Sequence, residues 1–239
     1  MKKTISLLGL VCLTALTGCT KQKECSETID TINATVARFD KMDADMDMTN
    51  PAKAAEQMKK LSKAVEDEAE KINELNPETE ELKKHVETYQ EMVNDMAKAT
   101  KKLAEAAKSM AELESGMAKS QKELTSAMEA VNGACTANAA GCAEIATKMQ
   151  QAPTGSEGDE IFMKKLEAFG GMLKAIKPTS PKVAAPLSQL VKAVEGQVAL
   201  LKKAKATEKA GEEAAAALTK ATDAEDGLVS AINTFCGAP

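Results

Sequence analysis

An apolar residue recurs at every seventh position between residues 82 and 131 without exception. The eight residues are Leu82, Tyr89, Met96, Leu103, Met110, Met117, Leu124 and Val131. An apolar period of seven held over this length is typical of one long helix packed lengthwise against other helices. The pattern predicts a helix over about 77–132. A second seam that starts at Val86 and Val93 becomes small and polar after residue 100, so we expect any bend near Gly116.

Five further segments have helical apolar spacing, and turn signals separate them. They cover about 26–48, 51–75, 137–150, 159–176 and 181–236. Asn50-Pro51 and Ser180-Pro181 each combine a capping residue with a proline suited to the first turn of a helix. The last segment is interpreted as one helix whose apolar seam is interrupted in the middle, around Gly211 and the alanines at 214–217. Two helices meeting near 207–212 are the alternative.

The composition agrees with a helical protein, because the chain is rich in Ala, Lys, Glu, Leu and Met and only 2% aromatic. We therefore predict an all-α, elongated, antiparallel helical bundle of coiled-coil type. Its two long helices are expected at about 77–132 and 181–236, with two pairs of shorter helices beside them. The bundle is expected as a single domain over 26–239. Residues 26–75 and the flanking halves of the long helices form its base, and 133–180 its distal tip.

Residues 1–19 have the organisation of an export signal. Lys2 and Lys3 precede a short apolar stretch that ends in Leu16-Thr17-Gly18-Cys19. The stretch is shorter than the roughly 20 apolar residues of a membrane-spanning helix. Its last four residues resemble the lipobox of bacterial lipoproteins. The resemblance implies that residues 1–18 are a cleaved signal peptide and that Cys19 carries a lipid.

The same resemblance implies a location and a first partner. Residues 19–25 are expected as a lipidated amino terminus and short tether, and the membrane is the partner through Cys19. Thr20 stands where Asp would mark retention in the inner membrane, so a Gram-negative cell would place the protein in its outer membrane. A location in the cell envelope is therefore expected.

The charged and aromatic residues argue against nucleic-acid binding. From Cys19 onward the chain has 29 basic and 36 acidic residues, a net charge of −7. Arg38 is the only arginine and Tyr89 the only tyrosine, and there is no tryptophan. An acidic chain with few guanidinium groups and few stacking rings lacks the usual means of binding nucleic acid. An unidentified protein partner is expected instead.

Four cysteines remain once Cys12 leaves with the signal and Cys19 is lipidated, namely Cys25, Cys135, Cys142 and Cys236. An even number in an exported chain indicates disulfides. If the last helix runs back along the bundle, Cys236 lies beside Cys25, and Cys135 lies near Cys142 at the other end. We predict these two pairs. Bonds between molecules, or a zinc site of four thiolates, are alternatives, although the spacing is wider than zinc motifs use.

Metal and catalytic motifs are weak. Met42, Met46 and Met48 alternate with aspartates and are candidate Cu(I) ligands, but packing and a solvated helix end explain them better. A calcium loop fails because Met48 and Ala54 occupy its glycine and bidentate-acid positions. His85 has no second histidine and is expected at an interface. No catalytic motif is present, so neither an enzyme nor a cofactor is expected.

These features predict a non-enzymatic, lipid-anchored envelope or surface protein that serves as a helical spacer, adaptor or interaction module. The alternative is a periplasmic lipoprotein that binds a metal or small ligand through the Met/Asp segment 42–48. A membrane-active helical toxin is less favoured, because residues 133–180 contain no long uncharged apolar run.

Overall fold

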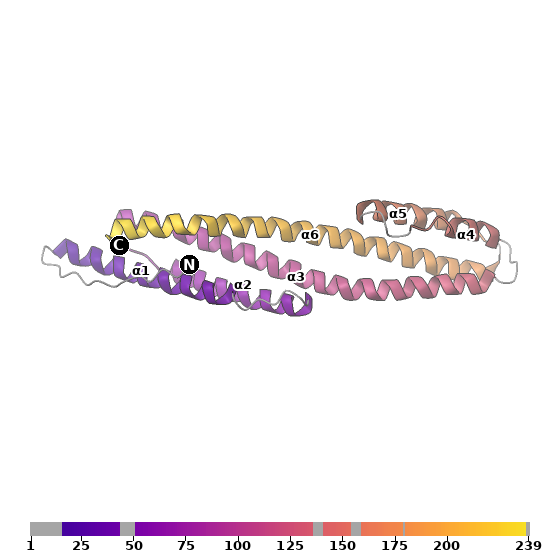
Figure 1. The fold of residues 1–239 in the computed structure, drawn as a ribbon, viewed down its shortest axis with the longest axis horizontal. Helices are drawn as coiled ribbons and strands as arrows, with labels where there is room; N and C mark the ends of the chain where they lie inside the picture. The colour runs from indigo at the N-terminus through magenta and orange to yellow at the C-terminus, as the bar shows by residue number, and fades with distance from the viewer. Residues whose placement is uncertain (1–15, 44–50, 136–140, 154–158, 179, 238–239) are drawn as a thin grey trace. The chain divides into compact units, whose positions relative to one another are not determined.

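The computed structural model describes residues 16–43, 51–135, 141–153, 159–178 and 180–237, with only the backbone for 16–19, 39–43, 51 and 159. Six α-helices make up most of these ranges, and no strand occurs within them (Figure 1). The helices are α1 (Leu16–Asp43), α2 (Pro51–Asn73), α3 (Glu80–Cys135), α4 (Cys142–Met149), α5 (Asp159–Ala175) and α6 (Pro181–Cys236). The predicted all-α bundle with two long helices is confirmed.

Helix α1 begins earlier than the sequence predicted, whereas α6 agrees with the prediction of one continuous helix. Helix α1 begins at Leu16, so residues 19–25, expected as a short tether, are helical. Few apolar residues mark this stretch; contacts with other helices through Glu24 and Cys25 hold it instead. Helix α6 runs through 207–212 without a break, so its interpretation as one helix is correct.

The chain forms two compact units. Unit 1 takes its described residues from Met1–Met46, Lys60–Lys101 and Ala216–Pro239, and unit 2 from Asp47–Lys59 and Lys102–Ala215. Helices α3 and α6 each contribute residues to both units.

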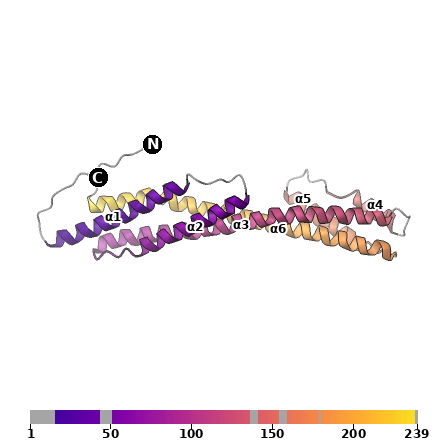
Figure 2. The same ribbon diagram turned by 90° about the horizontal axis from the view of Figure 1, so that it is seen from below.

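Unit 1 packs α1, most of α2, the first part of α3 and the last part of α6 around one core. Figures 1 and 2 show the yellow end of α6 and the indigo α1 running alongside the start of α3. The most deeply buried side chains are aliphatic apart from one tyrosine: Ile32, Val65, Ile72, Leu82, Val86, Tyr89, Val93 and Ile232. Burying such side chains is the main source of stability in a helical bundle.

Unit 2 packs α4 and α5 against the last part of α3 and the first part of α6. Its core includes Val131, Ile145, Leu166, Phe169, Leu173, Val183, Leu190 and Val194. Ala106 approaches Gly211, and Gly116 approaches Leu200, so residue numbers rise along α3 as they fall along α6. The two long helices are therefore antiparallel within this unit.

The buried face of α3 coincides only in part with the predicted series at every seventh residue from Leu82 to Val131. Leu82, Tyr89, Met96 and Val131 are buried, but Met110 is 44% exposed. A second seven-residue series is buried instead along most of the helix, namely Met92, Ala99, Leu113, Ser120 and Ala127, with Ala106 against Gly211. Sequence reasoning missed this series because alanine and serine give a weak apolar signal.

Candidate functional site

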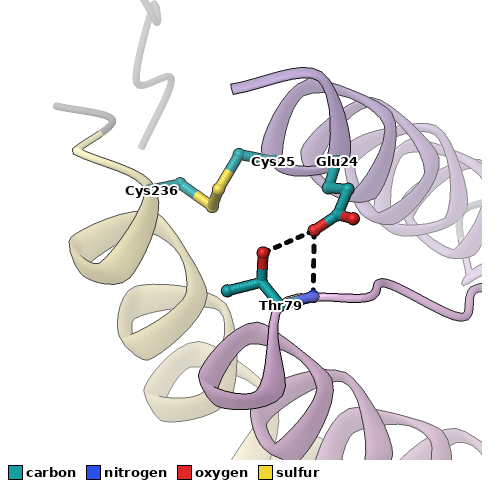
Figure 3. The surroundings of a disulfide bond; sticks show 4 residues. All are labelled: Glu24, Cys25, Thr79 and Cys236. Carbon is teal, nitrogen blue, oxygen red and sulfur yellow. Dashed lines mark hydrogen bonds between the residues drawn. A yellow bond between two sulfur atoms is a disulfide. The ribbon is translucent and has the colours of Figure 1, made fainter. Parts of the chain in front are cut away.

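A disulfide joins the first helix to the end of the last helix within unit 1. Cys25 of α1 and Cys236 of α6 form a disulfide with their Cα atoms 5.5 Å apart (Figure 3). The bond closes a separation of 211 residues. Cys135 and Cys142 form the second disulfide, with Cα atoms 5.4 Å apart, and link α3 to α4 in unit 2. The predicted pairing is confirmed, and no free thiolate of this set remains for zinc.

Glu24 caps the start of α3 from the neighbouring helix α1. Its carboxylate accepts hydrogen bonds from the backbone N–H groups of Glu78 and Thr79 at 3.0 and 3.2 Å. The Thr79 hydroxyl donates a third bond at 2.7 Å (Figure 3). These donors to the ionised form, above all the hydroxyl, lower the pKa of Glu24. Glu24 therefore bonds N–H groups of the two residues that immediately precede α3, where a helix start lacks internal partners.

Phe235 receives two further contacts at this end of unit 1. The Lys21 ammonium lies 4.0 Å from the centroid of its ring, and the His85 ring lies 5.9 Å away. A cation over an aromatic face is an attractive contact. His85 is thus half-buried at an interface between α3 and α6, as the sequence indicated.

Cys19 belongs to the same helix as these contacts. Its backbone lies in α1, six residues before Cys25, which corresponds to about 9 Å at the rise of an α-helix. Its side chain lies outside the described atoms, so lipid attachment stays a prediction. A lipid on Cys19 would be attached directly to the helix that the disulfide fixes.

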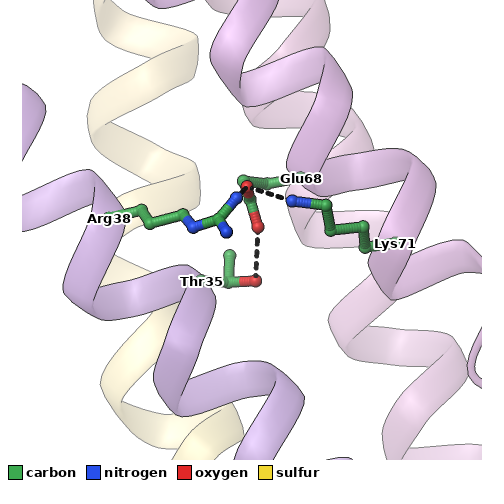
Figure 4. A network of polar contacts seen from close by, with 4 residues as sticks. All are labelled: Thr35, Arg38, Glu68 and Lys71. Atoms are coloured by element: carbon green, nitrogen blue, oxygen red, sulfur yellow. Dashed lines mark hydrogen bonds and ion pairs between the residues drawn. The ribbon is translucent and has the colours of Figure 1, made fainter.

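Glu68 forms the centre of a polar network between α1 and α2 (Figure 4). One carboxylate oxygen, Oε1, accepts hydrogen bonds from Arg38 Nη1 and from Lys71 Nζ, the latter at 2.7 Å. The other, Oε2, accepts one from the Thr35 hydroxyl at 3.2 Å. Glu68 is only 3% exposed, whereas the Arg38 and Lys71 side chains are 54% and 46% exposed. The network joins a buried anion to two cations at the surface.

The pKa of Glu68 reflects two opposing effects. Burial favours the neutral acid, but the hydrogen bonds and charges of Lys71 and Arg38 outweigh it and hold the pKa below its usual range. Glu68 is therefore ionised at neutral pH, and α1 is held to α2 by an ion pair as well as by apolar contacts.

A cleft of about 310 Å³ opens beside this network. It is lined by Asp30, Thr31, Ala34, Thr35, Arg38, Glu68 and Lys71, all within unit 1. A second cleft, of about 470 Å³, lies in unit 2 between α3 and α6, with Lys122, Glu123 and Lys192 as its charged lining. Only the first of these two contains a buried charged side chain.

Tyr89 is fully buried and donates a hydrogen bond to Glu225 at 3.2 Å. Burial, reinforced by the negative charge of Glu225, raises the pKa of the phenol. A phenol that resists ionisation suits a structural contact between α3 and α6 better than proton transfer.

The side chains of the metal candidates of the sequence, Met42, Met46 and Met48, lie outside the described part of the molecule. Met42 lies near the end of α1 with only its backbone described, and Met46 and Met48 fall outside the described residues. Among the described residues, no group of three or more His, Cys, Asp or Glu side chains is placed to hold a metal ion. None of the described helices is long and apolar enough to cross a membrane.

Comparison of this chain with protein-family models, with curated proteins and with solved structures gave no match. What the protein does must therefore be inferred from its own residues.

Proposed function

We propose that this chain is a non-enzymatic, lipid-anchored envelope or surface protein that serves as a helical spacer, adaptor or interaction module. The observation that carries the proposal is the Cys25–Cys236 disulfide. It ties the carboxyl-terminal end of α6 to α1, six residues after the lipobox cysteine. Both chain ends would then be held at the membrane by one covalent base.

The contacts around this disulfide support a fixed attachment. Glu24 bonds α1 to the start of α3, and Lys21 contacts Phe235 near the end of α6. Because residues 20–25 are helical and bonded, a lipid on Cys19 would orient unit 1 as well as retain it. Two or more acyl chains make such anchoring stable, whereas one chain gives only marginal binding.

The two units differ in net charge, and their roles in the proposal follow from the position of Cys19 and not from this charge. From Cys19 onward unit 1 has 12 basic and 20 acidic residues, a net charge of −8. Unit 2 has 17 basic and 16 acidic residues, a net charge of +1. In the proposal, unit 1 is the membrane-proximal base and unit 2 presents α4 and α5 to a partner protein.

Metabolic labelling tests the anchor. The full-length chain is expressed in a Gram-negative bacterium with radiolabelled palmitate, beside Cys19→Ser and, as a matched control, Cys142→Ser. We expect label and envelope fractionation for the wild type and for Cys142→Ser, and loss of both for Cys19→Ser. Label that survives in Cys19→Ser would remove the lipid-anchor proposal.

Scattering and cross-linking test the spacer and adaptor roles. Residues 19–239 with Cys19→Ser, shown by circular dichroism to be helical, are studied by small-angle X-ray scattering. The spacer role requires a particle several times longer than wide, and a compact globule would contradict it. Cross-linking in intact cells, followed by mass spectrometry, should recover a partner joined to lysines of unit 2 such as Lys148. Cross-links confined to the chain itself would contradict the adaptor role.

A further inference from the structure

We propose that the cleft between α1 and α2 is a binding site for a carboxylate group. Arg38 and Lys71 would bind the ligand's carboxylate, and the buried Glu68 would hold both cations in place. This inference goes beyond the proposed function and does not depend on the lipid at Cys19.

The site has unused hydrogen-bond donors at the right place. Arg38 and Lys71 each contribute one donor to Glu68 Oε1 in the described structure. A guanidinium carries five N–H donors and an ammonium three, so most of their donors remain for a ligand. Both side chains are about half exposed and line the cleft. Figure 4 shows them reaching Glu68 from opposite sides.

Glu68 organises these cations. It is nearly fully buried and has hydrogen bonds from Thr35, Arg38 and Lys71, so its position is fixed by three partners. A fixed carboxylate orders two flexible side chains before a ligand arrives and so reduces the entropy lost on binding. Arg38, Lys71 and Glu68 together retain a net charge of +1, which favours an anionic ligand.

One exposed acid, Asp30, also lines the cleft. Asp30 lies eight residues before Arg38 on α1, or about 12 Å along the helix. At that distance in contact with solvent its repulsion of a bound anion is largely screened. The Arg38 side of the cleft is therefore the side that favours an anion.

The chemistry of the donors favours a carboxylate. A guanidinium presents two parallel N–H groups that match the two oxygens of a carboxylate, and such charge-assisted bonds are stronger than neutral ones. Arg38 is the only arginine of the chain, and it lies in this cleft. The cleft of unit 2 has lysines but neither an arginine nor a buried acid. A carboxylate could come from a free small acid or from the carboxyl terminus of a peptide.

Because Arg38 is unique, its side chain gives a single Nε–H signal in the NMR spectrum of the ¹⁵N-labelled mature chain in detergent. The probes are acetyl-trialanine with a free carboxylate, the same peptide as a carboxamide, and propionate. We expect the carboxylate peptide to shift the Arg38 signal in a saturable way, with the carboxamide at least about tenfold weaker. Propionate of similar affinity would identify small acids as the source, and a clear preference for the peptide would identify a peptide terminus.

Variants complete the test. Lys71→Ala should weaken binding of the carboxylate peptide about tenfold, and Lys192→Ala, in the cleft of unit 2, should not change it. Arg38→Lys, measured by calorimetry, keeps the charge but loses the planar fork, so affinity should fall while the melting temperature stays near that of the wild type. The site is overturned if the Arg38 signal does not move with millimolar peptide. Equal binding of the carboxamide, or unchanged binding by Lys71→Ala, also overturns it.

Discussion

Units 1 and 2 are both antiparallel helical assemblies, yet different interactions hold them. In unit 1 a disulfide, a buried glutamate and a cap from a neighbouring helix each connect residues far apart in the sequence. In unit 2 the disulfide spans seven residues, and the ion pairs between α5 and α6 are exposed. Glycines there let helices approach closely, as where Gly170 faces Val194.

This contrast indicates which interactions specify the arrangement of helices in each unit. Polar partners in unit 1 determine which helix lies beside which, because a buried acid or an open helix end needs a particular donor or acceptor. Steric fit in unit 2 determines how closely the helices pack. The proposed membrane base and the proposed carboxylate site both lie in the unit with specific polar contacts.

The disulfides give the largest contrast between the units. Cys25→Ser with Cys236→Ser should lower the free energy of unfolding by about 5 kcal/mol, because the bond closes a loop of 211 residues. The Cys135–Cys142 bond closes a far shorter loop, so Cys135→Ser with Cys142→Ser should lower the free energy of unfolding by about 2 kcal/mol. Urea denaturation followed by circular dichroism measures both. Equal losses would show that loop entropy is not what distinguishes the two bonds.

The Glu68 network gives the next largest effect. Glu68→Gln keeps the shape but loses the charge-assisted bonds, and should cost about 1–2 kcal/mol at pH 7. The control is Glu66→Gln, whose 3.6 Å pair with Lys101 is partly exposed and should matter little.

Low pH should remove the stabilisation that the Glu68 network provides. The folded pKa of Glu68 is depressed, so its stabilisation is complete above the unfolded pKa near 4.5 and is lost as pH falls through the folded value. Unfolding measured from pH 7 to pH 3 should show a smaller acid loss in Glu68→Gln than in the wild type. If the two proteins lost the same stability between pH 7 and pH 3, ionisation of Glu68 would not contribute to the stability of unit 1.

Adjacent glycines in α5 test steric fit in unit 2. Gly171→Ala meets no atom within 4 Å and should stabilise the protein by about 0.5–1 kcal/mol through helix propensity. Gly170→Ala places Cβ 3.1 Å from Val194 Cγ1, and a β-branched side chain yields poorly, so this variant should be less stable than Gly171→Ala by about 1 kcal/mol or more. Thermal melts of the two variants measure this difference in stability. Equal stabilisation by both would mean that α5 can shift to accommodate the added methyl group.

The exposed ion pairs of unit 2 should give the smallest effect. Hydrogen bonds from Lys205 and Lys164 lower the pKa of Glu160 to about 2. The group is at the surface, so Glu160→Gln should leave the melting temperature unchanged within error. The pKa of Glu160, measured from its carboxyl signal in an NMR titration, should rise toward its ordinary value in 1 M salt. A clear drop in melting temperature would show that such pairs hold α5 in place.

Much of the fold could be predicted from the sequence because local signals were strong. The proline at residue 51 and the one at 181 start helices where their capping residues indicated. The start of α1 was missed because its stabilising contacts, from Lys21, Glu24 and Cys25, are made with distant residues. The Arg38–Glu68 network was missed for the same reason, since the partners are 30 residues apart and each resembles an ordinary surface charge in the sequence.

Periodicity and capping act over a few neighbouring residues, so they established that the chain is helical and that α2, α5 and α6 begin at residues 51, 159 and 181. The four cysteines after Cys19 allow three pairings, and the expected antiparallel course of the helices selected one of them. Which face of α3 is buried depends on tertiary packing, which leaves Met110 44% exposed and buries Ala127 in a core. Burial depends on how many helices cover a given stretch, and that number is set by contacts between segments far apart in the chain.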